Sequence, residues 1–422
     1  MERLRTTDFH FQPFSKKQKQ VLTWWVDTSP VHGCEGLIAD GAIRSGKTLS
    51  MSLSFVMWAM NDFKEQNFGM AGKTIGSFRR NVLVTLKWML TSRGYQVSDR
   101  RGDNLVIISR GKVTNYFYLF GGKDERSQDL IQGVTLAGMF FDEVALMPQS
   151  FVNQATGRLS VAGSKMWFNC NPSGPYHYFK TDWIDQKDKK QLLYLHFSMD
   201  DNLSLSEAIK QRYRSMYSGV FYDRYILGHW TVAEGIIYDM FDEDRHVQSV
   251  QPNPNQPAYL SIDYGTQNAT VFLLWQQLAG KWCCVKEYYY SGRTEQRQKT
   301  DVEYANDLEQ FTAGFRIKKI IIDPSAASFI AEIKKRGFTI KRAKNDVLDG
   351  IRLVGSLLNE DKLLFSPACA NTLKEFHAYV WDDKAVARGE DKPVKENDHA
   401  MDAMRYFAMS VLRKKGGVSV WK

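Results

Sequence analysis

The sequence predicts an α/β protein of two domains with a proline-rich connection between them. Over residues 1–230, apolar runs alternate with amphipathic stretches, which is the pattern of a parallel sheet covered by helices. The composition changes at residues 248–259, because three of the chain's 11 prolines fall in QSVQPNPNQPAY. A second alternating pattern follows. We therefore expect a first domain over residues 1–235, a linker over 236–257 and a second domain over 258–422.

The spacing of apolar residues places the elements of both domains. In the first, strands are expected at 36–40, 69–73, 105–109, 113–120, 138–141, 165–169 and 191–196, and helices at 15–27, 47–61, 78–92 and 205–216. In the second, strands are expected at 259–265, 269–278, 281–290, 318–325 and 338–343, and helices at 302–311, 327–336, 348–358, 372–381 and 398–412. Three strands in a meander before alternating strands and helices is, by analogy, the order of an RNase H-like domain.

Residues 41–48, GAIRSGKT, form a phosphate-binding loop between an apolar strand and a helix. They fit the template G-x-x-x-x-G-K-[ST], in which glycines let backbone N–H groups surround phosphates. We expect Lys47 to reach the β- and γ-phosphates of ATP and Thr48 to offer its hydroxyl to Mg²⁺. The helix that begins near Lys47 adds its N-terminal partial charge. The expected ATP-binding residues of the loop are Gly41, Ser45, Gly46, Lys47 and Thr48.

Two adjacent acids complete the chemistry that a P-loop ATPase needs. Asp142 and Glu143 end the apolar run of LAGMFFDEVALM. An ATPase requires one carboxylate for the metal and one to activate water, and we assign these roles to Asp142 and Glu143 in that order. The first domain is therefore expected to have a RecA-like (ASCE) P-loop ATPase fold.

Other polar residues near these motifs are candidates for further roles in ATP hydrolysis. Arg44, within the loop, is a candidate to stabilise the transition state, and Arg158 is the alternative. Gln18 is a candidate for contact with adenine. Asn169 and Asn171 end a strand, where a polar side chain can sense the γ-phosphate and couple it to motion or can belong to an ordinary turn. Asn171 is our choice for the coupling residue.

Carboxylates recur in the second domain at strand ends and on the last helix. Asp263 lies in YLSIDYG, Asp323 follows KKIII, and His399 and Asp402 stand three residues apart on one helix face. Oxygen ligands suit hard cations, and two such ions close together can activate water for phosphodiester hydrolysis. We therefore expect Asp263, Asp323 and Asp402 to hold two Mg²⁺ or Mn²⁺ ions, with His399 as a further ligand or a proton relay.

Neighbouring residues of the second domain have other expected roles. Glu287 is a possible fourth ligand, Asp398 a cap for the last helix, and Cys283 and Cys284 are expected in the core. Residues 381–395, WDDKAVARGEDKPVK, read as a charged hairpin that could gate the acids.

The charge of the chain favours a polyanionic partner. The net charge is +9 and the pI about 9.1. Basic clusters that could follow a DNA backbone occur at 318–319, 334–336, 341–344, 392–395 and 413–415. No apolar run is long enough for a transmembrane helix, so no membrane partner is expected.

The ordered motifs GAIRSGKT, FFDEV, WFNCNPSGPYHYF, SIDYG, IIIDPSA and NDHAMDAMRY resemble the large terminase subunit of tailed bacteriophages and prophages, with the PBSX-like branch closest. The resemblance runs from about residue 14 to 412. It matches Lys47, Thr48, Asp142 and Glu143 to the family's Walker positions. It also matches Asp263, Asp323 and Asp402 to its nuclease acids, and His399 to a histidine of this branch.

The resemblance implies an ATPase that moves double-stranded DNA into a procapsid, and a nuclease that cuts concatemeric DNA. The implied partners are DNA, a small terminase subunit and the portal protein, with several copies in a ring on the portal. The implied location is the host cytoplasm and, transiently, the portal vertex. One departure concerns Arg44, which stands three residues before Lys47, whereas some relatives place their loop arginine one residue earlier.

Two other functions share some of these features. A helicase–nuclease of repair or replication would also carry a P-loop, an Asp-Glu pair and basic charge. However, 422 residues leave little room for the second RecA-like domain that most such helicases need. A DNA-binding prophage remnant without enzymatic activity would not require the intact set of Lys47, Glu143, Asp263, Asp323 and Asp402.

Overall fold

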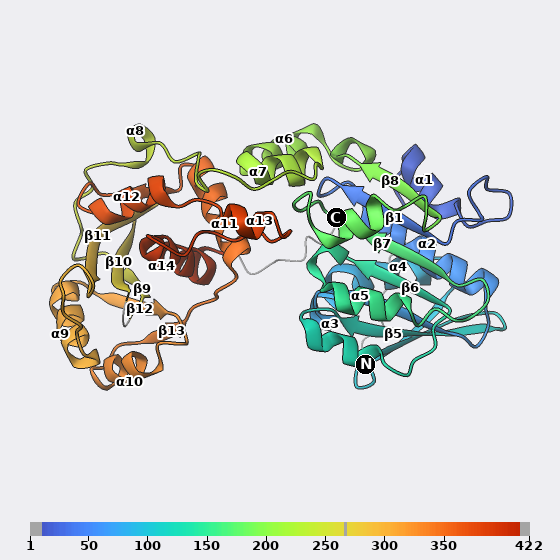
Figure 1. Cartoon of the computed structure of the whole chain (residues 1–422), viewed down its shortest axis with the longest axis horizontal. Coiled ribbons are helices and arrows are strands. Elements are labelled where there is room, and N and C mark those ends of the chain that lie inside the picture. Colours follow the sequence, from blue (N-terminus) through green and yellow to red (C-terminus); the bar gives the residue numbers. More distant parts are fainter. Residues whose placement is uncertain (1–10, 266–267, 414–422) are drawn as a thin grey trace. The chain divides into compact units, whose positions relative to one another are not determined.

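The computed structural model describes residues 11–265 and 268–413, which form two compact units (Figure 1). The first unit runs to Arg212 and also includes Tyr222–Val232. The second consists of Tyr213–Phe221 and the chain from Ala233 onward. The expected linker at 236–257 is therefore part of the second unit. Ile236 pairs with Val380, and the buried His246 ring lies 3.1 Å from the carbonyl oxygen of Leu358.

An eight-stranded sheet forms the first unit, in the order β3-β4-β5-β2-β6-β7-β1-β8. The six strands β5-β2-β6-β7-β1-β8 pair in parallel. Strands β3 and β4 are antiparallel additions at the β5 edge. The strands are β1 (Gly36–Gly41), β2 (Asn67–Gly72), β3 (Gln96–Arg100), β4 (Leu105–Arg110), β5 (Val113–Gly121), β6 (Gly138–Asp142), β7 (Lys165–Asn169) and β8 (Leu192–Phe197). The expected parallel sheet is confirmed for the strands that carry the motifs.

The helices from the N-terminus to the junction of the units are α1 (Lys16–Thr23), α2 (Lys47–Asp62), α3 (Ile75–Phe78), α4 (Val84–Thr91), α5 (Gln149–Thr156), α6 (Glu207–Met216) and α7 (Gly219–Tyr222). The single helix expected at 78–92 is interrupted by a π-helical turn at Arg79–Leu83. Helix α2 is largely buried, and Phe55 and Trp58 on it pack their rings against Trp167 of β7. This packing fixes the start of α2 at the end of β1.

A six-stranded sheet forms the second unit, in the order β13-β12-β9-β10-β11-β14. Strands β9, β10 and β11 are an antiparallel meander, and β12, β13 and β14 each join in parallel. The bounds are β9 (Ala258–Asp263), β10 (Ala269–Leu278), β11 (Lys281–Ser291), β12 (Ile317–Ile322), β13 (Ile340–Arg342) and β14 (Leu363–Phe365). The meander followed by alternating strands and helices is the order along the chain that the sequence predicts, with β14 as an addition.

Helices cover both faces of this second sheet. They are α8 (Glu243–His246), α9 (Asp301–Thr312), α10 (Ala327–Lys335), α11 (Val347–Asn359), α12 (Ala370–Ala378), α13 (Asp383–Val386) and α14 (His399–Phe407). Residues of α9 and α10, such as Leu308 and Phe329, share a core with Ile262 and Phe272. Helix α14 packs on the other face, where the Phe407 ring stacks on Trp275 of β10 at 4.5 Å.

The ends of segment 381–395 pair in antiparallel fashion, as in the hairpin that the sequence predicts, but a short helix lies between them. Trp381 is buried and pairs with Pro393, and α13 lies between the two ends. The apolar Trp381, Ala385 and Val386 anchor the segment and leave its charges outside. Within the described residues, no helix combines the length and apolar character needed to cross a membrane.

Candidate active sites

The phosphate loop of the first unit requires glycine at both ends. Gly41 has φ of 121° and Gly46 has φ of 81°, a backbone region that side chains disfavour. A Cβ at Gly41 would overlap the carbonyl oxygen of Phe197 in β8, and one at Gly46 would overlap the Gln18 amide. The loop is thus closely packed against both β8 and α1. This packing restricts the backbone conformation of the loop where it enters α2.

Lys47 directs its ammonium into the loop. Its Nζ donates to the carbonyl oxygens of Gly41 (3.0 Å) and Ala42 (2.6 Å), and to Ser45 Oγ (3.1 Å) and Asn171 Oδ1 (3.2 Å). Burial lowers the pKa of Lys47 to about 8. The structure thus brings Ser45, Lys47 and Asn171 together. Phosphate oxygens would offer this desolvated ammonium stronger partners than carbonyls do.

Three polar side chains converge at the carboxyl ends of β6 and β7 and the start of α2. Thr48 Oγ1 donates to Asp142 Oδ1 at 3.2 Å, and the Asn169 amide donates to Thr48 Oγ1 at 2.9 Å and to Asp142 Oδ1 at 2.5 Å. Burial, together with the charge of adjacent Glu143, raises the pKa of Asp142 to about 7. A cation beside Thr48 and Asp142 would offset that burial cost.

Glu143 follows Asp142 in a left-handed backbone conformation, with φ of 59°. Such a conformation is unusual outside glycine and occurs where the surroundings enforce it. It turns the chain sharply after β6, so that Asp142 and Glu143 do not continue the alternation of a strand.

Of the three further candidates, two lie at the phosphate loop and one does not. They are Gln18, Arg44 and Arg158. Gln18 is buried beside Gly46, which brings it to the loop. Arg44 is exposed within the loop, and its carbonyl accepts from the Asn202 amide at 2.7 Å. The Arg158 backbone bonds to Leu136, before β6 begins, whereas Asp142 ends that strand. Leu136 and Asp142 are six residues apart along this strand, or about 20 Å at the usual rise per residue. Arg158 therefore lies at the opposite end of the sheet from the phosphate loop and cannot reach the loop of its own chain.

Asp40, which no motif of the sequence singles out, is completely buried at the end of β1. Its Oδ1 lies 3.0 Å from Nδ1 of His196, and its Oδ2 accepts from Trp230 Nε1 at 2.7 Å. The only signal in the sequence is an acid closing an apolar strand directly before the loop. Asp40 therefore ties the base of the loop to β8 and to the Tyr222–Val232 segment.

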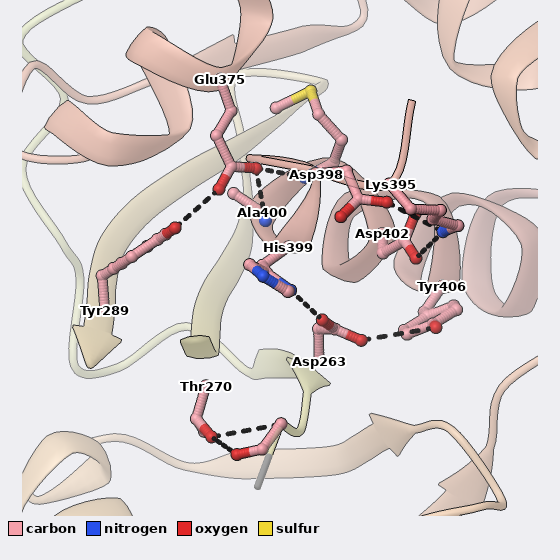
Figure 2. A network of polar contacts seen from close by, with 12 residues as sticks. Asp263, Thr270, Tyr289, Glu375, Lys395, Asp398, His399, Ala400, Asp402 and Tyr406 are labelled. Carbon is pink, nitrogen blue, oxygen red and sulfur yellow. Dashed lines mark hydrogen bonds and ion pairs between the residues drawn. The ribbon is translucent and has the colours of Figure 1, made fainter. Parts of the chain in front are cut away.

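In the second unit, the register of β9 and β12 brings two of the predicted acids to one end of the sheet. Ile262 pairs with Ile322, so Asp263 and Asp323 follow at the same edge. Asp263 Oδ2 lies 3.0 Å from Nδ1 of His399 (Figure 2). Burial raises the pKa of Asp263, although the hydrogen bond to His399 opposes this. Asp323 accepts from the Ser325 N–H and the Asn345 amide, at 2.8 and 2.9 Å.

Asp402 faces the same edge from α14 but is bound by two cations. Arg405 donates to its Oδ1 at 2.5 Å, and the Lys395 ammonium lies 3.0 Å from its Oδ2 and 2.8 Å from Asp398 Oδ2. In the described residues, no three His, Cys, Asp or Glu side chains are close enough together to hold a metal ion. The carboxylates still fit a divalent ion chemically, because Lys395 shows that positive charge is stabilised between Asp398 and Asp402.

Two of the roles expected in this unit are wrong. Glu287 is not directed at the acids, because its carboxylate accepts from the backbone and side chains of Asn371 and Thr372 at the start of α12. Asp398 stands at the N-cap position of α14 but makes no side-chain cap hydrogen bond. Glu375 caps α14 instead, although no local sequence pattern indicates it. Cys283 and Cys284 are buried, as predicted.

The folds and sites define a class of protein that combines a P-loop ATPase with an RNase H-like nuclease. Residues 38–245 match the family described as "Terminase large subunit, T4likevirus-type, N-terminal", and residues 280–410 match "Terminase RNaseH-like domain". The chain belongs to the terminase large-subunit family. It is accordingly a large terminase subunit with a packaging ATPase domain and a nuclease domain, rather than a helicase–nuclease or a DNA-binding remnant.

Individual relatives agree with this assignment. The structure of the large terminase from a thermophilic bacteriophage is 62% identical, with a TM-score of 0.92 over 95% of this chain and 100% of that one. A structure of the same thermophilic phage protein in complex with ATP-γ-S is 60% identical, with a TM-score of 0.89 and the same coverage. The terminase large subunit of Escherichia phage T5 is 24% identical over 298 residues, which is 66% of each chain.

Proposed function

We propose that the phosphate-loop site of the first unit hydrolyses ATP to drive double-stranded DNA into a procapsid. The observation that carries this proposal is the convergence of Lys47, Thr48 and Asp142 at the start of α2. Gly41, Ser45 and Gly46 would surround the phosphates, Lys47 would neutralise them, and Thr48 with Asp142 would hold Mg²⁺. The ATP-γ-S complex of the relative from the thermophilic phage supports a nucleotide ligand.

The remaining residues of this site have supporting roles in the proposal. Glu143 orients the attacking water, and Asn171, which accepts from Lys47, senses the γ-phosphate. Arg44 is the candidate within the loop for stabilising the transition state, and Gln18 is the candidate for adenine contact. The first unit provides the ATPase domain and the second the nuclease domain.

For the second unit, we propose that Asp263, Asp323 and Asp402 cut DNA with two divalent ions, Mg²⁺ or Mn²⁺. When bound, the ions would activate water and stabilise the leaving oxygen. Asp263 and Asp323 hold their positions at adjacent strand ends, and α14 presents Asp402. The His399 ring, 3.0 Å from Asp263, orients that carboxylate and can accept or release a proton.

The proposed partners are those of packaging. They are double-stranded DNA, a small terminase subunit and the portal protein, with several copies of the chain in a ring on the portal. The site of action is the host cytoplasm and, transiently, the portal vertex. We also propose that the chain belongs to the PBSX-like branch, on the strength of its NDHAMDAMRY motif.

Cleavage of supercoiled plasmid in Mn²⁺ tests the nuclease proposal. Wild type should nick and linearise the plasmid, EDTA should stop it, and Asp263→Ala should be inactive. Equal cleavage by wild type and Asp263→Ala would place the activity elsewhere. Thr300→Ala, which removes the N-cap of α9, is the matched control and should cut like wild type.

DNA-stimulated ATP hydrolysis tests the first site. Wild type should hydrolyse ATP and Glu143→Gln should lose hydrolysis while it still binds a fluorescent nucleotide, because the amide cannot act as a base. Normal turnover by Glu143→Gln would remove Glu143 from the mechanism.

A further inference from the structure

Helix α14 begins directly at the nuclease site, because His399 is its first residue and Asp402 its fourth. The first N–H groups of a helix have no partner within the helix and need an outside acceptor. Asp398 does not supply one, since its carboxylate is 2.8 Å from the ammonium of Lys395. The start of α14 must therefore be fixed by another group.

Glu375 of α12 provides that acceptor. Its side chain is buried, and its Oε2 accepts from the backbone N–H of Ala400 at 2.7 Å and of Met401 at 3.2 Å (Figure 2). Its Oε1 accepts from the Tyr289 hydroxyl at 3.0 Å. A buried carboxylate is costly, but two helix N–H groups, a hydroxyl and the positive end of α14 offset that cost.

The helix that carries Glu375 is held in the same way. Glu287 of β11 accepts from the N–H of Asn371 at 3.0 Å and of Thr372 at 2.6 Å, at the start of α12. Glu287 and Tyr289 stand two residues apart on β11, so their side chains leave the same face of the sheet. Strand β11 thus makes two contacts with α12. Glu287 binds the start of the helix, and Tyr289 binds the carboxylate of Glu375, which α12 carries.

We propose that Glu375 is a positioning residue of the nuclease site, which caps α14 from outside and so sets where His399 and Asp402 stand relative to Asp263. It is not a metal ligand, because both of its oxygens are directed at α14 and Tyr289. This inference rests on the proposed metal-dependent nuclease. If the first turn of α14 were not anchored, His399 and Asp402 would occupy several positions relative to Asp263. Metal affinity would then fall, because metal sites weaken when contacts that orient their ligands are removed.

The experiment measures Mn²⁺ binding to the full chain by the EPR signal of unbound Mn²⁺, together with hydrogen exchange of the α14 amides. Glu375→Ala should weaken Mn²⁺ binding about ten-fold and speed exchange at Ala400 and Met401. Glu375→Gln retains an oxygen that can accept both N–H groups, so it should stay within about three-fold of wild type. Thr300→Ala removes a helix cap elsewhere in the unit and should leave Mn²⁺ binding unchanged.

Wild-type Mn²⁺ binding by Glu375→Ala would overturn the inference. If Glu375→Ala does not fold, Tyr289→Phe decides, because it removes the hydroxyl that holds Glu375 Oε1 and so lets the capping carboxylate turn away from α14. It should weaken Mn²⁺ binding measurably, and unchanged binding would overturn the inference. Asp402→Asn separates the two proposals: if it binds Mn²⁺ like wild type, the proposed metal site is itself wrong, whereas loss in Asp402→Asn but not in Glu375→Ala contradicts only the positioning role.

Discussion

Lys395 carries a positive charge that would compete with a metal ion at the proposed nuclease site. Its ammonium lies 2.8 Å from Asp398 and 3.0 Å from Asp402. A divalent ion that binds Asp402 must displace or share this contact. We therefore predict that Lys395→Ala lowers the Mn²⁺ concentration for half-maximal plasmid cleavage by a factor of about three, because the partly exposed pair is worth under about 1 kcal/mol.

The matched control is Lys395→Arg, which keeps the positive charge and should keep the wild-type Mn²⁺ requirement. The difference between Lys395→Ala and wild type should shrink at high salt, because salt screens exposed charges. A higher Mn²⁺ requirement in Lys395→Ala would show that the ammonium supports catalysis instead of competing with the metal.

Glu375 gives the second unit a predictable response to pH. Burial raises the pKa of its carboxyl from 4.5 to about 7. The folded state therefore binds this proton more tightly than the unfolded chain does, and its stability falls as pH rises from about 4.5 to about 7. Glu375→Gln carries no titrating group, so wild type should lose up to about 3 kcal/mol relative to this variant across that range.

Denaturant titrations read by hydrogen exchange in β9 and β10 measure this difference for the second unit alone. Equal pH dependence of wild type and Glu375→Gln would show that the Glu375 pKa is not raised. A gain in the stability of wild type with rising pH, relative to the variant, would contradict the sign.

The residues that sequence predicted well are those whose partners are close in the chain or whose chemistry follows a fixed template. Gly41, Lys47 and Thr48 share one loop of eight residues, and their spacing alone implies phosphate binding. Glu375 acts on Ala400 and Asp40 on Trp230, and no local pattern indicates such distant pairs. Glu287 was misassigned because its partner, the start of α12, depends on how that helix packs.

At the scale of elements, strands that are buried on both faces could be placed from sequence. Strand β7 has the predicted bounds, because its apolar run is bordered by polar residues. Strand β3 was missed, since QVSDR at the sheet edge has no buried residue and little apolar character. The three-residue β14 and the π-helical turn at Arg79–Leu83 depend on neighbouring elements, so periodicity does not reveal them.

The junction of β1 and α2 yields a prediction about backbone geometry. Gly41 and Gly94 both have positive φ. A Cβ at Gly41 would overlap the backbone of β8, whereas a Cβ at Gly94 would meet no atom within 4 Å. Gly94→Ala should cost the first unit about 1–2 kcal/mol from conformation alone. Gly41→Ala should cost clearly more, because the β8 backbone must also move, and it should abolish binding of a fluorescent nucleotide.

Thermal unfolding followed by hydrogen exchange of α2 and β7 compares the two variants, and plasmid cleavage should be unaffected by either. Equal stability of Gly41→Ala and Gly94→Ala would mean that the close approach of the loop to β8 does not constrain it.

At the scale of the whole molecule, each unit has its own hydrophobic core. Phe55 and Trp167 belong to the core of the first unit, and Ile262 and Phe272 to that of the second. Each set of site residues also lies within one unit, from Gly41 to Asn171 in the first and from Asp263 to Asp402 in the second. A substitution that removes one polar group from one site should therefore leave the other site folded.

We accordingly predict that the two activities can be removed separately. Lys47→Ala should reduce DNA-stimulated ATP hydrolysis at least about a hundred-fold, an estimate of about 3 kcal/mol for one group that stabilises developing charge. It should leave cleavage of supercoiled plasmid in Mn²⁺ intact. Asp323→Ala should give the reverse, with cleavage lost and ATP hydrolysis retained. Both assays are needed on both variants. Loss of the two activities together in Lys47→Ala would mean that the nuclease site depends on the state of the phosphate loop. Unchanged cleavage by Asp323→Ala would exclude that carboxylate from the nuclease site.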